Sequence, residues 1–301
     1  MKLRAQAPLA LAAALLMLIC TSLTMAPLAS AATHARTYDD PLPRAHLRLQ
    51  ATAQQTRNQN VRYGGGSVMA GTTHIYAIFW EPRGNVAPGY NRLLTRFFQD
   101  VGNSPLYRIA GEYKQANGAA PANAVLSGVW MDYRHYSGNT ILDSDIQHEV
   151  TRAQRTNGWQ SSMHNMFFVF TEAGENICID STHAQCATNT FCAYHSAFGT
   201  DTIYASMPYA ASFGCENTVG PNHNAADETI DGASHELMEA VTDPLGDAWV
   251  DASGNEIGDK CVAQFGWRNA QGANVVWNGH SYLVQKEWDN QTGTCRMAPR
   301  H

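Results

Sequence analysis

The stretch "GASHELMEAVTDP", residues 232–244, is the centre of a predicted helix. Apolar residues recur at helical spacing from about Ala225 to Asp243, and the proline that follows disfavours further helix. His235 and Glu239 are four residues apart, so their side chains leave the same face of the helix one turn apart. Two side chains in this arrangement can bind one metal ion, and Glu236 lies beside them.

The order of these residues, His-Glu-x-x-Glu, differs at one position from the HExxH motif of zinc peptidases. In zincin helices of that kind, the first glutamate takes a proton from water that the metal ion activates. We therefore assign Glu236 as the candidate general base, and His235 and Glu239 as candidate metal ligands. A carboxylate in place of an imidazole makes the ligand set harder, so calcium, manganese or no stable metal are the alternatives to zinc, the expected ion.

An acidic segment follows the helix and offers further oxygen ligands. In "DPLGDAWVDASGNEIGDKC", residues 243–261, the candidate third ligand is Asp259, twenty residues past Glu239. Glu256 is its close competitor, and Asp243 is a candidate for a place beside the ligands. Two other interpretations stay open: a solvated polar loop, and a calcium loop, although the acids do not follow the EF-hand spacing.

A neutral ligand would balance these carboxylates, and two histidines are candidates for it. His195 in "FCAYHSAFG", residues 191–199, is the first candidate because Cys192 would fix its position. His223 in "GPNHNAAD", just ahead of the helix, is the second, as a ligand or as a neighbour of the ligands. A lone histidine is more often structural or exposed, and this interpretation stays open for both.

The first 31 residues have the pattern of a secretory signal peptide. Lys2 and Arg4 precede an apolar run, and the small residues "ASA" at 29–31 suit a signal peptidase. The alternative, an uncleaved membrane anchor, needs about 20 apolar residues, and this run is shorter. We therefore expect cleavage near Ala31 and secretion to the extracellular space or the periplasm.

The remaining chain divides into two parts. Residues 32–60 are rich in Pro, Gln, Asn and Arg and predict an extended leader or propeptide. Loss of the two cations of the signal peptide moves the net charge from −6 to −8, which disfavours nucleic acid as a partner. No later segment is apolar for long enough to predict stable membrane insertion, and the oligomeric state is not predicted.

The cysteines predict a disulfide framework. Of the seven, Cys20 lies in the predicted signal peptide, and an even number in an oxidising compartment favours three disulfides. Cys261 with Cys295 is a plausible pair, while the other four lie close together in the sequence. A cysteine metal cluster is the rival interpretation, but the chain contains no CxxC pair. The six cysteines are Cys178, Cys186, Cys192, Cys215, Cys261 and Cys295.

Helical and strand patterns are interleaved in residues 61–301, with no linker that would divide them. Apolar spacing predicts helices at residues 90–100 and 144–158, the second with a capping box of Ser144 and Gln147. Short aromatic and β-branched runs predict buried strands at residues 74–80, 165–172 and 202–210. We therefore predict an α+β fold: a single domain with a mixed β-sheet packed by helices, a zincin-like active-site helix and disulfide staples.

Several segments resemble the phosphate-induced protein 1 (EXORDIUM-like) family of secreted proteins, and more closely its bacterial relatives. They are "IYAIFW", "FCAYH", "SHELMEAVTDPLGDAW", "GNEIGDKC" and "VQKEWDNQTGTC", and the similarity spans roughly Tyr63 to Cys295. In that family the helix motif reads HExxE, followed by T-[DN]-P and an AW pair, here Thr242, Asp243, Pro244, Ala248 and Trp249. The resemblance implies that Glu239 belongs to the family pattern, and that His195 and residues 256–261 fall on family motifs. Plant members are associated with cell-wall and growth responses, and the resemblance implies no reaction.

Two functions from different classes follow from these motifs. The first is a secreted metal-dependent hydrolase, above all a peptidase, with a peptide or an extracellular polymer as substrate. The second is a non-catalytic extracellular or cell-wall binding protein with a structural calcium ion. In such a protein, exposed tryptophan rings would form a flat surface that binds sugars, called the sugar platform below. The candidate residues are Trp249, Trp267, Trp277 and Trp288. A serine hydrolase is disfavoured because the GxSxG motif is absent.

Overall fold

The computed structural model describes residues 44–47, 59–136, 138, 140–215 and 220–300. The predicted signal peptide, residues 1–31, lies outside these residues. Most of the predicted leader, residues 32–60, also lies outside them. The described parts of the leader are a strand at residues 44–47 and residues 59–60. Among the described helices, none combines the length and the apolar character that a membrane crossing requires.

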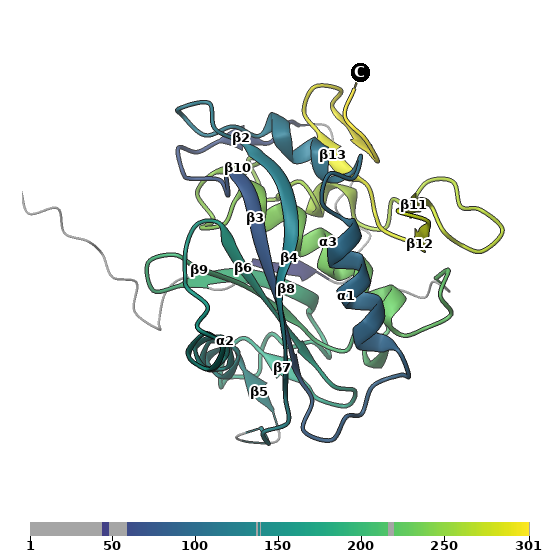
Figure 1. Ribbon diagram of the computed structural model, residues 1–301. Helices are drawn as coiled ribbons and strands as arrows, with labels where there is room; N and C mark the ends of the chain where they lie inside the picture. The colour runs from purple at the N-terminus through teal and green to yellow at the C-terminus, as the bar shows by residue number, and fades with distance from the viewer. Residues whose placement is uncertain (1–43, 48–58, 137, 139, 216–219, 301) are drawn as a thin grey trace, which may run out of the picture. The chain divides into compact units, whose positions relative to one another are not determined.

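The central sheet has the strand order β1-β8-β9-β6-β3-β4 (Figure 1). Four neighbouring strands are parallel: β9 (Thr202–Met207), β6 (Asn165–Thr171), β3 (Gly71–Trp80) and β4 (Pro121–Asp132). At one edge, β8 (Phe191–Phe198) runs antiparallel to β9, and β1 (Arg44–Leu47) runs antiparallel to β8. The predicted buried strands correspond to β3, β6 and β9 and are confirmed, whereas β1, β4 and β8 were not anticipated.

Helices connect the parallel strands and cover both faces of the sheet, as parallel pairing requires. α1 (Tyr90–Asp100) connects β3 to β4, α2 (Asp143–Asn157) lies between β4 and β6, and α3 (Ala226–Thr242) follows β9. α1 and α3 pack together on one face, and α2 packs on the other. A mixed sheet packed by helices is thus confirmed, although helices and strands alternate more regularly than in a typical α+β fold.

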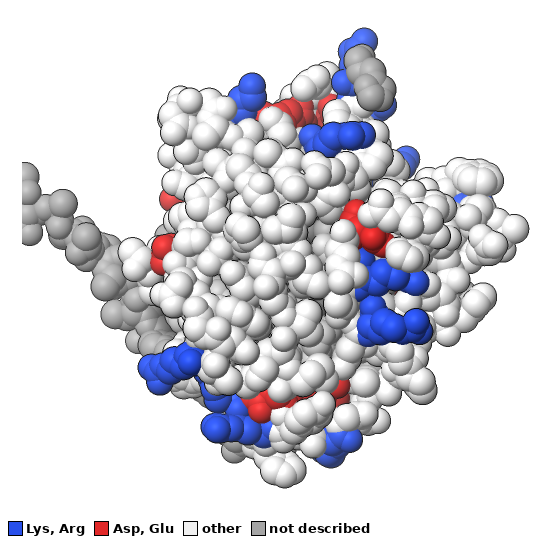
Figure 2. All heavy atoms as spheres, in the orientation of Figure 1, with Lys and Arg blue, Asp and Glu red and all other residues white. Residues whose placement is uncertain are grey.

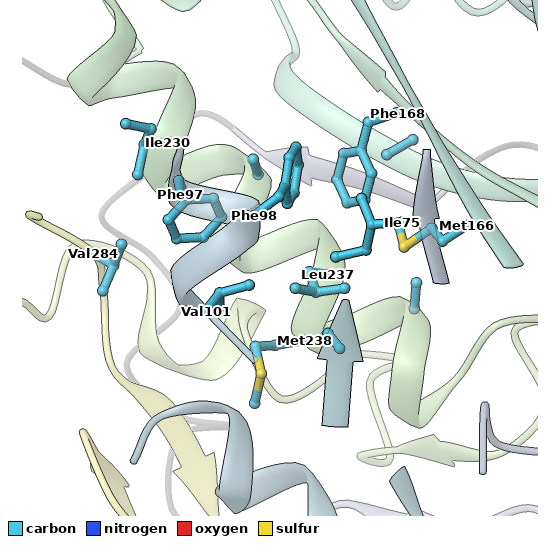
Figure 3. Packing of buried hydrophobic residues seen from close by; sticks show 14 of the residues in the cluster. Ile75, Phe97, Phe98, Val101, Met166, Phe168, Ile230, Leu237, Met238 and Val284 are labelled. Carbon is cyan, nitrogen blue, oxygen red and sulfur yellow. The ribbon is translucent and has the colours of Figure 1, made fainter. Parts of the chain in front are cut away.

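The core between α1, α3 and the sheet consists of aromatic and aliphatic side chains (Figure 3). Phe97 and Phe98 of α1 are both fully buried. The ring of Phe98 lies 4.7 Å from the ring of Phe168 on β6, measured between centroids. Leu237 of α3 belongs to the same cluster. Burial of a side chain of this size contributes about 1.5–3 kcal/mol, so this core fixes α3 against the sheet.

α2 covers the opposite face through three apolar residues at helical spacing, Ile146, Val150 and Ala153. The start of this helix corrects one prediction, because α2 begins at Asp143 and Ser144 lies inside its first turn. Asp145 instead accepts a hydrogen bond from the N–H of Leu142 at 2.9 Å. The predicted capping box of Ser144 and Gln147 is therefore wrong, and Gln147 donates its side-chain hydrogen bond to Asp143 at 2.7 Å.

Smaller elements flank the central sheet. Four two-stranded sheets pair β2 (Arg62–Tyr63) with β10 (Trp249–Val250), β5 (Ile141–Leu142) with β7 (Ile177–Cys178), β11 (Val275–Trp277) with β12 (His280–Tyr282), and β13 (Glu287–Asp289) with β14 (Thr294–Arg296). Short 3-10 helices are η2 (Tyr107–Glu112), η3 (Ala210–Ser212) and η4 (Asp259–Cys261).

The predicted disulfides are confirmed, as Cys178–Cys186, Cys192–Cys215 and Cys261–Cys295.

Charges are unevenly divided between surface and interior. The face shown in Figure 2 is mostly uncharged, and its charged side chains lie mainly toward the margin. Sixteen of the described Asp and Glu residues are buried, whereas Lys260 is the one described Lys or Arg residue that is buried. A buried carboxylate needs a hydrogen-bond donor, a cation or a proton, so the interior must supply these.

Candidate metal centre

α3 carries three predicted site residues into the interior. Every residue from Thr229 to Thr242 is buried. His235 and Glu236 are fully buried, and Glu239 is 2% exposed. Polar groups on a helix buried all round must find their partners inside the protein. Here the partners come from β8 and from the residues around η4.

Three predicted ligands lie close together: His235 and Glu239 on α3, and Asp259 at the start of η4. Nε2 of His235 lies 3.0 Å from Oε1 of Glu239 and 3.9 Å from Oδ1 of Asp259. The backbone N–H of Asp259 donates a hydrogen bond to the same Oε1 at 2.9 Å. One ligand atom from each residue lies within 4.8 Å of the other two, a spacing at which one ion can contact all three.

His195 reaches the same cluster from β8. Its Nδ1 lies 3.1 Å from Oε2 of Glu236 and 3.8 Å from Oε2 of Glu239. Its Nε2 lies 3.7 Å from Oε1 of Glu256. His195, Glu236 and Glu239 form a second group of possible ligands, which shares Glu239 with the first. The structure thus brings together six residues that the sequence singled out: His195, His235, Glu236, Glu239, Glu256 and Asp259.

Strong local contacts hold the segment that supplies Asp259. Nζ of Lys260 lies 3.2 Å from Oδ2 of Asp251 and 4.4 Å from the ring centroid of Trp288. The next residue, Cys261, forms the disulfide that ties η4 to β14. Because the residues that follow Asp259 are anchored in this way, its carboxylate is held close to α3.

Gly258 brings the backbone directly against the candidate ligands. A Cβ atom at this position would lie 2.7 Å from Nδ1 of His235 and 2.9 Å from Oε1 of Glu239. Its carbonyl oxygen accepts a hydrogen bond from Nε2 of Gln285 at 2.8 Å. The absence of a side chain is thus a steric requirement at this position.

Burial and charge oppose each other at these residues. Burial alone would lower the pKa of His235, but the surrounding carboxylates, first that of Glu239, raise it well above its usual range. Burial would raise the pKa of Glu239, yet the two histidines lower it to about 2. Burial and the charge of Glu239 raise the pKa of Asp259 to about 7. A proton on His235 thus balances part of the carboxylate charge, and a divalent cation bound here would take its place.

Two buried acids next to the cluster escaped the sequence analysis. Glu287 on β13 is fully buried, and neither carboxylate oxygen has a hydrogen-bond partner among the described residues. Burial raises its pKa well above the usual range, His235 opposes this shift, and Glu239 adds to it. Asp231 accepts a hydrogen bond from the N–H of Gln285 at 2.5 Å. Its position four residues before His235 was a usable signal, whereas Glu287 approaches from a distant strand and carries no local signal.

The other two predicted neighbours of the ligands occupy different positions. Asp243 ends α3, is fully buried and accepts a hydrogen bond from the N–H of Ala248 at 2.6 Å. Burial would lower the pKa of His195, but Glu236, Glu239 and, to a lesser extent, Asp243 raise it. His223 is exposed in the turn before α3, and it belongs to neither group of possible ligands.

Taken together, the fold and the site define a disulfide-linked protein with helices on both faces of a mixed sheet and a buried histidine–carboxylate cluster. The chain is similar to the Protein EXORDIUM-like 5 of Arabidopsis thaliana, with 22% identity over 316 residues, covering 88% of this chain and 86% of the plant protein. This similarity supports the resemblance to the EXORDIUM-like family. No protein-family model matches the chain, and no solved structure matches it.

Proposed function

We propose that this protein is a secreted metal-dependent hydrolase that cleaves peptides. The observation that carries the proposal is the position of Glu236 beside the ligand group. Its Oε2 lies 3.1 Å from Nδ1 of His195, while the adjoining residue, His235, belongs to the group with Glu239 and Asp259. A carboxylate beside a metal ion, held by a second polar residue, is the arrangement that general-base catalysis of hydrolysis requires.

The donor atoms fit a divalent ion of the zinc type. Zinc accepts imidazole and carboxylate ligands, and three protein ligands leave a fourth position for water or substrate. We assign His235, Glu239 and Asp259 as these ligands, with zinc as the expected ion and calcium or manganese as alternatives. A bound ion would supply Lewis-acid chemistry and lower the pKa of water at the open position.

The residues around the ligands would move and hold the proton. Burial raises the pKa of Glu236, with the hydrogen bond to His195 opposing this shift, so its carboxylate accepts a proton more readily than an exposed one. Glu236 would take a proton from water and pass it to the leaving amine of the substrate. His195 would orient the carboxylate of Glu236 through its Nδ1. A zincin-like role for α3 is supported by its packing against a mixed sheet with β8 alongside.

A second candidate function has support from the burial of the cluster. His195, His235, Glu236 and Glu239 are each no more than 2% exposed. Complete enclosure is typical of a structural ion, and the carboxylate-rich donor set would suit calcium. The sugar platform of this second hypothesis is reduced in the structure, because Trp277 and Trp288 are buried and Trp249 is half-buried. Trp267 is 81% exposed and remains available to a ligand.

The three disulfides fit an extracellular protein, since such bonds persist in oxidising compartments. We propose export through the signal peptide at residues 1–31. The natural mature chain, purified from culture medium with its N-terminus sequenced, would begin after Ala31 if cleavage occurs there.

The substitution Glu236→Gln tests the hydrolase proposal. It keeps the size of the side chain and removes its ability to accept a proton, so we expect hydrolysis of a peptide library to fall by at least 100-fold. Metal content, measured by elemental analysis, and the melting temperature should stay near those of the unchanged chain. Glu81→Gln is a matched control because Glu81 is also buried but lies outside the cluster, with its Oε2 bonded to Asn91. Full hydrolysis by the Glu236→Gln chain would refute the role of Glu236.

A further inference from the structure

We propose that strand β1, residues 44–47, occupies the peptide-binding edge of this site and keeps the protein latent. The same edge, the outer side of β8, would then bind a substrate peptide as an additional antiparallel strand once β1 has left. This inference rests on the proposed function, because it names the conformation in which a peptide substrate binds and the segment that excludes it.

The pairing of β1 with β8 places the leader beside a site residue. Arg44 lies opposite His195 in the antiparallel register, and the pairing continues to Leu47 opposite Phe191, with an irregularity at its end. β8 pairs on its other side with β9, so β1 covers the side that would otherwise be the free edge of the sheet. Figure 1 draws β1 as the short purple strand. β1 also contacts α3, so it bridges the two elements that carry the cluster.

The burial of the cluster indicates that a substrate must displace part of the protein. Both histidines and two of the glutamates are no more than 2% exposed, and among the ligand group only Asp259 is open to solvent, with 24% of its side chain exposed. A hydrolase of peptides must admit a backbone of several residues to its catalytic groups. Among the elements that contact both β8 and α3, β1 is the one that comes from the predicted leader.

The physical basis for exchange of β1 with a substrate is the backbone itself. An edge strand presents unpaired N–H and C=O groups, and an extended peptide can satisfy them whatever its sequence. A strand on the same chain has an effective concentration on the order of millimolar, so a free peptide at micromolar concentration competes poorly with it. Proteolytic removal of the leader would abolish this advantage and would open the edge.

The experiment uses the mature chain with residues 52–57 replaced by the recognition sequence of a site-specific protease. The chain is purified intact, one half is cleaved, and the released leader is removed by gel filtration. We expect the amides within residues 191–198 that point toward β1 to exchange hydrogen at least tenfold faster after cleavage, while those bonded to β9 stay protected, and we expect peptide hydrolysis to rise at least tenfold. Equal exchange and equal hydrolysis before and after cleavage would overturn the proposal.

A peptide added in trans provides an independent readout. A fluorescent peptide with the sequence of residues 42–50 should bind the cleaved chain at least tenfold more tightly than the intact chain, measured by anisotropy. The same peptide with Ala45→Pro is the matched control, because proline disrupts strand pairing. Equal binding of both peptides, or equal binding to cleaved and intact chains, would contradict occupation of β8 by β1.

The outcomes separate this inference from the proposed function. If cleavage accelerates exchange in β8 and permits peptide binding without any hydrolysis, then the leader covers the edge and the hydrolase proposal fails. If hydrolysis is present and equal in both chains, with exchange unchanged, then the hydrolase stands and the role of β1 is refuted. Cleaved chain carrying Glu236→Gln shows whether the observed hydrolysis belongs to this site.

Discussion

The carboxylate of Glu239 lies close to both histidines of the cluster. Its Oε1 lies 3.0 Å from Nε2 of His235, and its Oε2 lies 3.8 Å from Nδ1 of His195. A histidine at this position would place a third imidazole ring between the other two and would remove the carboxylate that contacts both of them. The low pKa of Glu239, about 2, keeps its carboxylate ionised at every physiological pH. The glutamate in place of the second histidine thus has a geometric reason.

The substitution Gly258→Ala tests whether this glycine positions the candidate ligands. The added methyl group would lie 2.7 Å from Nδ1 of His235 and 2.9 Å from Oε1 of Glu239, so the backbone must move away from α3. We expect the metal affinity to fall at least tenfold, measured by titration with a competing chelator. The control is Gly111→Ala, since a methyl group there meets nothing closer than 3.6 Å. A metal affinity unchanged by Gly258→Ala would show that this glycine does not position the ligands.

Residue identity alone revealed only part of the site. The spacing of His235, Glu236 and Glu239 predicts their common location because all three lie on one helix. Asp259 was found by its distance along the chain, and the structure places it at the start of η4. Glu287 was missed because its proximity depends on how β13 packs against η4, the element that carries Asp259, which no local pattern encodes.

At the scale of elements, α3 is a helix buried all round. Sequence spacing predicted its bounds within one residue, because the apolar period and the proline after it are local signals. Its complete burial was not predictable in the same way, since the sheet, α1 and the C-terminal segments that cover it are remote in sequence. β8 was missed for a related reason: its antiparallel direction depends on pairing with β9.

The first turn of α3, seven residues before His235, carries a residue whose protonation depends on pH. Glu228 is half-buried, its Oε2 has no hydrogen-bond partner among the described residues, and burial followed by the charge of Asp227 raises its pKa to about 7. The folded protein therefore binds this proton more tightly than the unfolded chain, whose pKa is 4.5. The contribution of Glu228 to stability therefore falls as pH rises from about 4.5 to about 7, and it stays level above pH 7.

The substitution Glu228→Gln should remove the loss of stability that ionisation of Glu228 causes. At pH 8 we expect the variant to be more stable than the unchanged chain by roughly 1 kcal/mol, a value reduced for solvent screening of a half-buried group. At pH 4 the two chains should be nearly equal, because Glu228 is then protonated in both states. Urea unfolding with disulfides intact, followed by circular dichroism at both pH values, measures the difference. A stability gap that is the same at pH 4 and pH 8 would contradict the account.

At the scale of the whole molecule, the C-terminal segments close the site. Cys261–Cys295 joins η4 to β14, and Gln285 bonds to both Asp231 and Gly258. The sequence made this pair plausible but could not fix it, because six cysteines allow fifteen pairings, and the structure shows that Cys261 and Cys295 are bonded. The strand order of the sheet, and the entry of residues 44–47 into it, were not predictable because register depends on contacts between distant segments.

The central claim is that the buried cluster around α3 binds a divalent metal ion. Elemental analysis of the mature chain, purified without added metal or chelator, tests it most directly. We expect about one divalent ion per chain, and less than a tenth of that in the chain with Glu239→Gln, because this substitution removes the carboxylate shared by both ligand groups. A folded natural chain that contains no metal, and that binds none on titration with zinc, manganese or calcium, would contradict it.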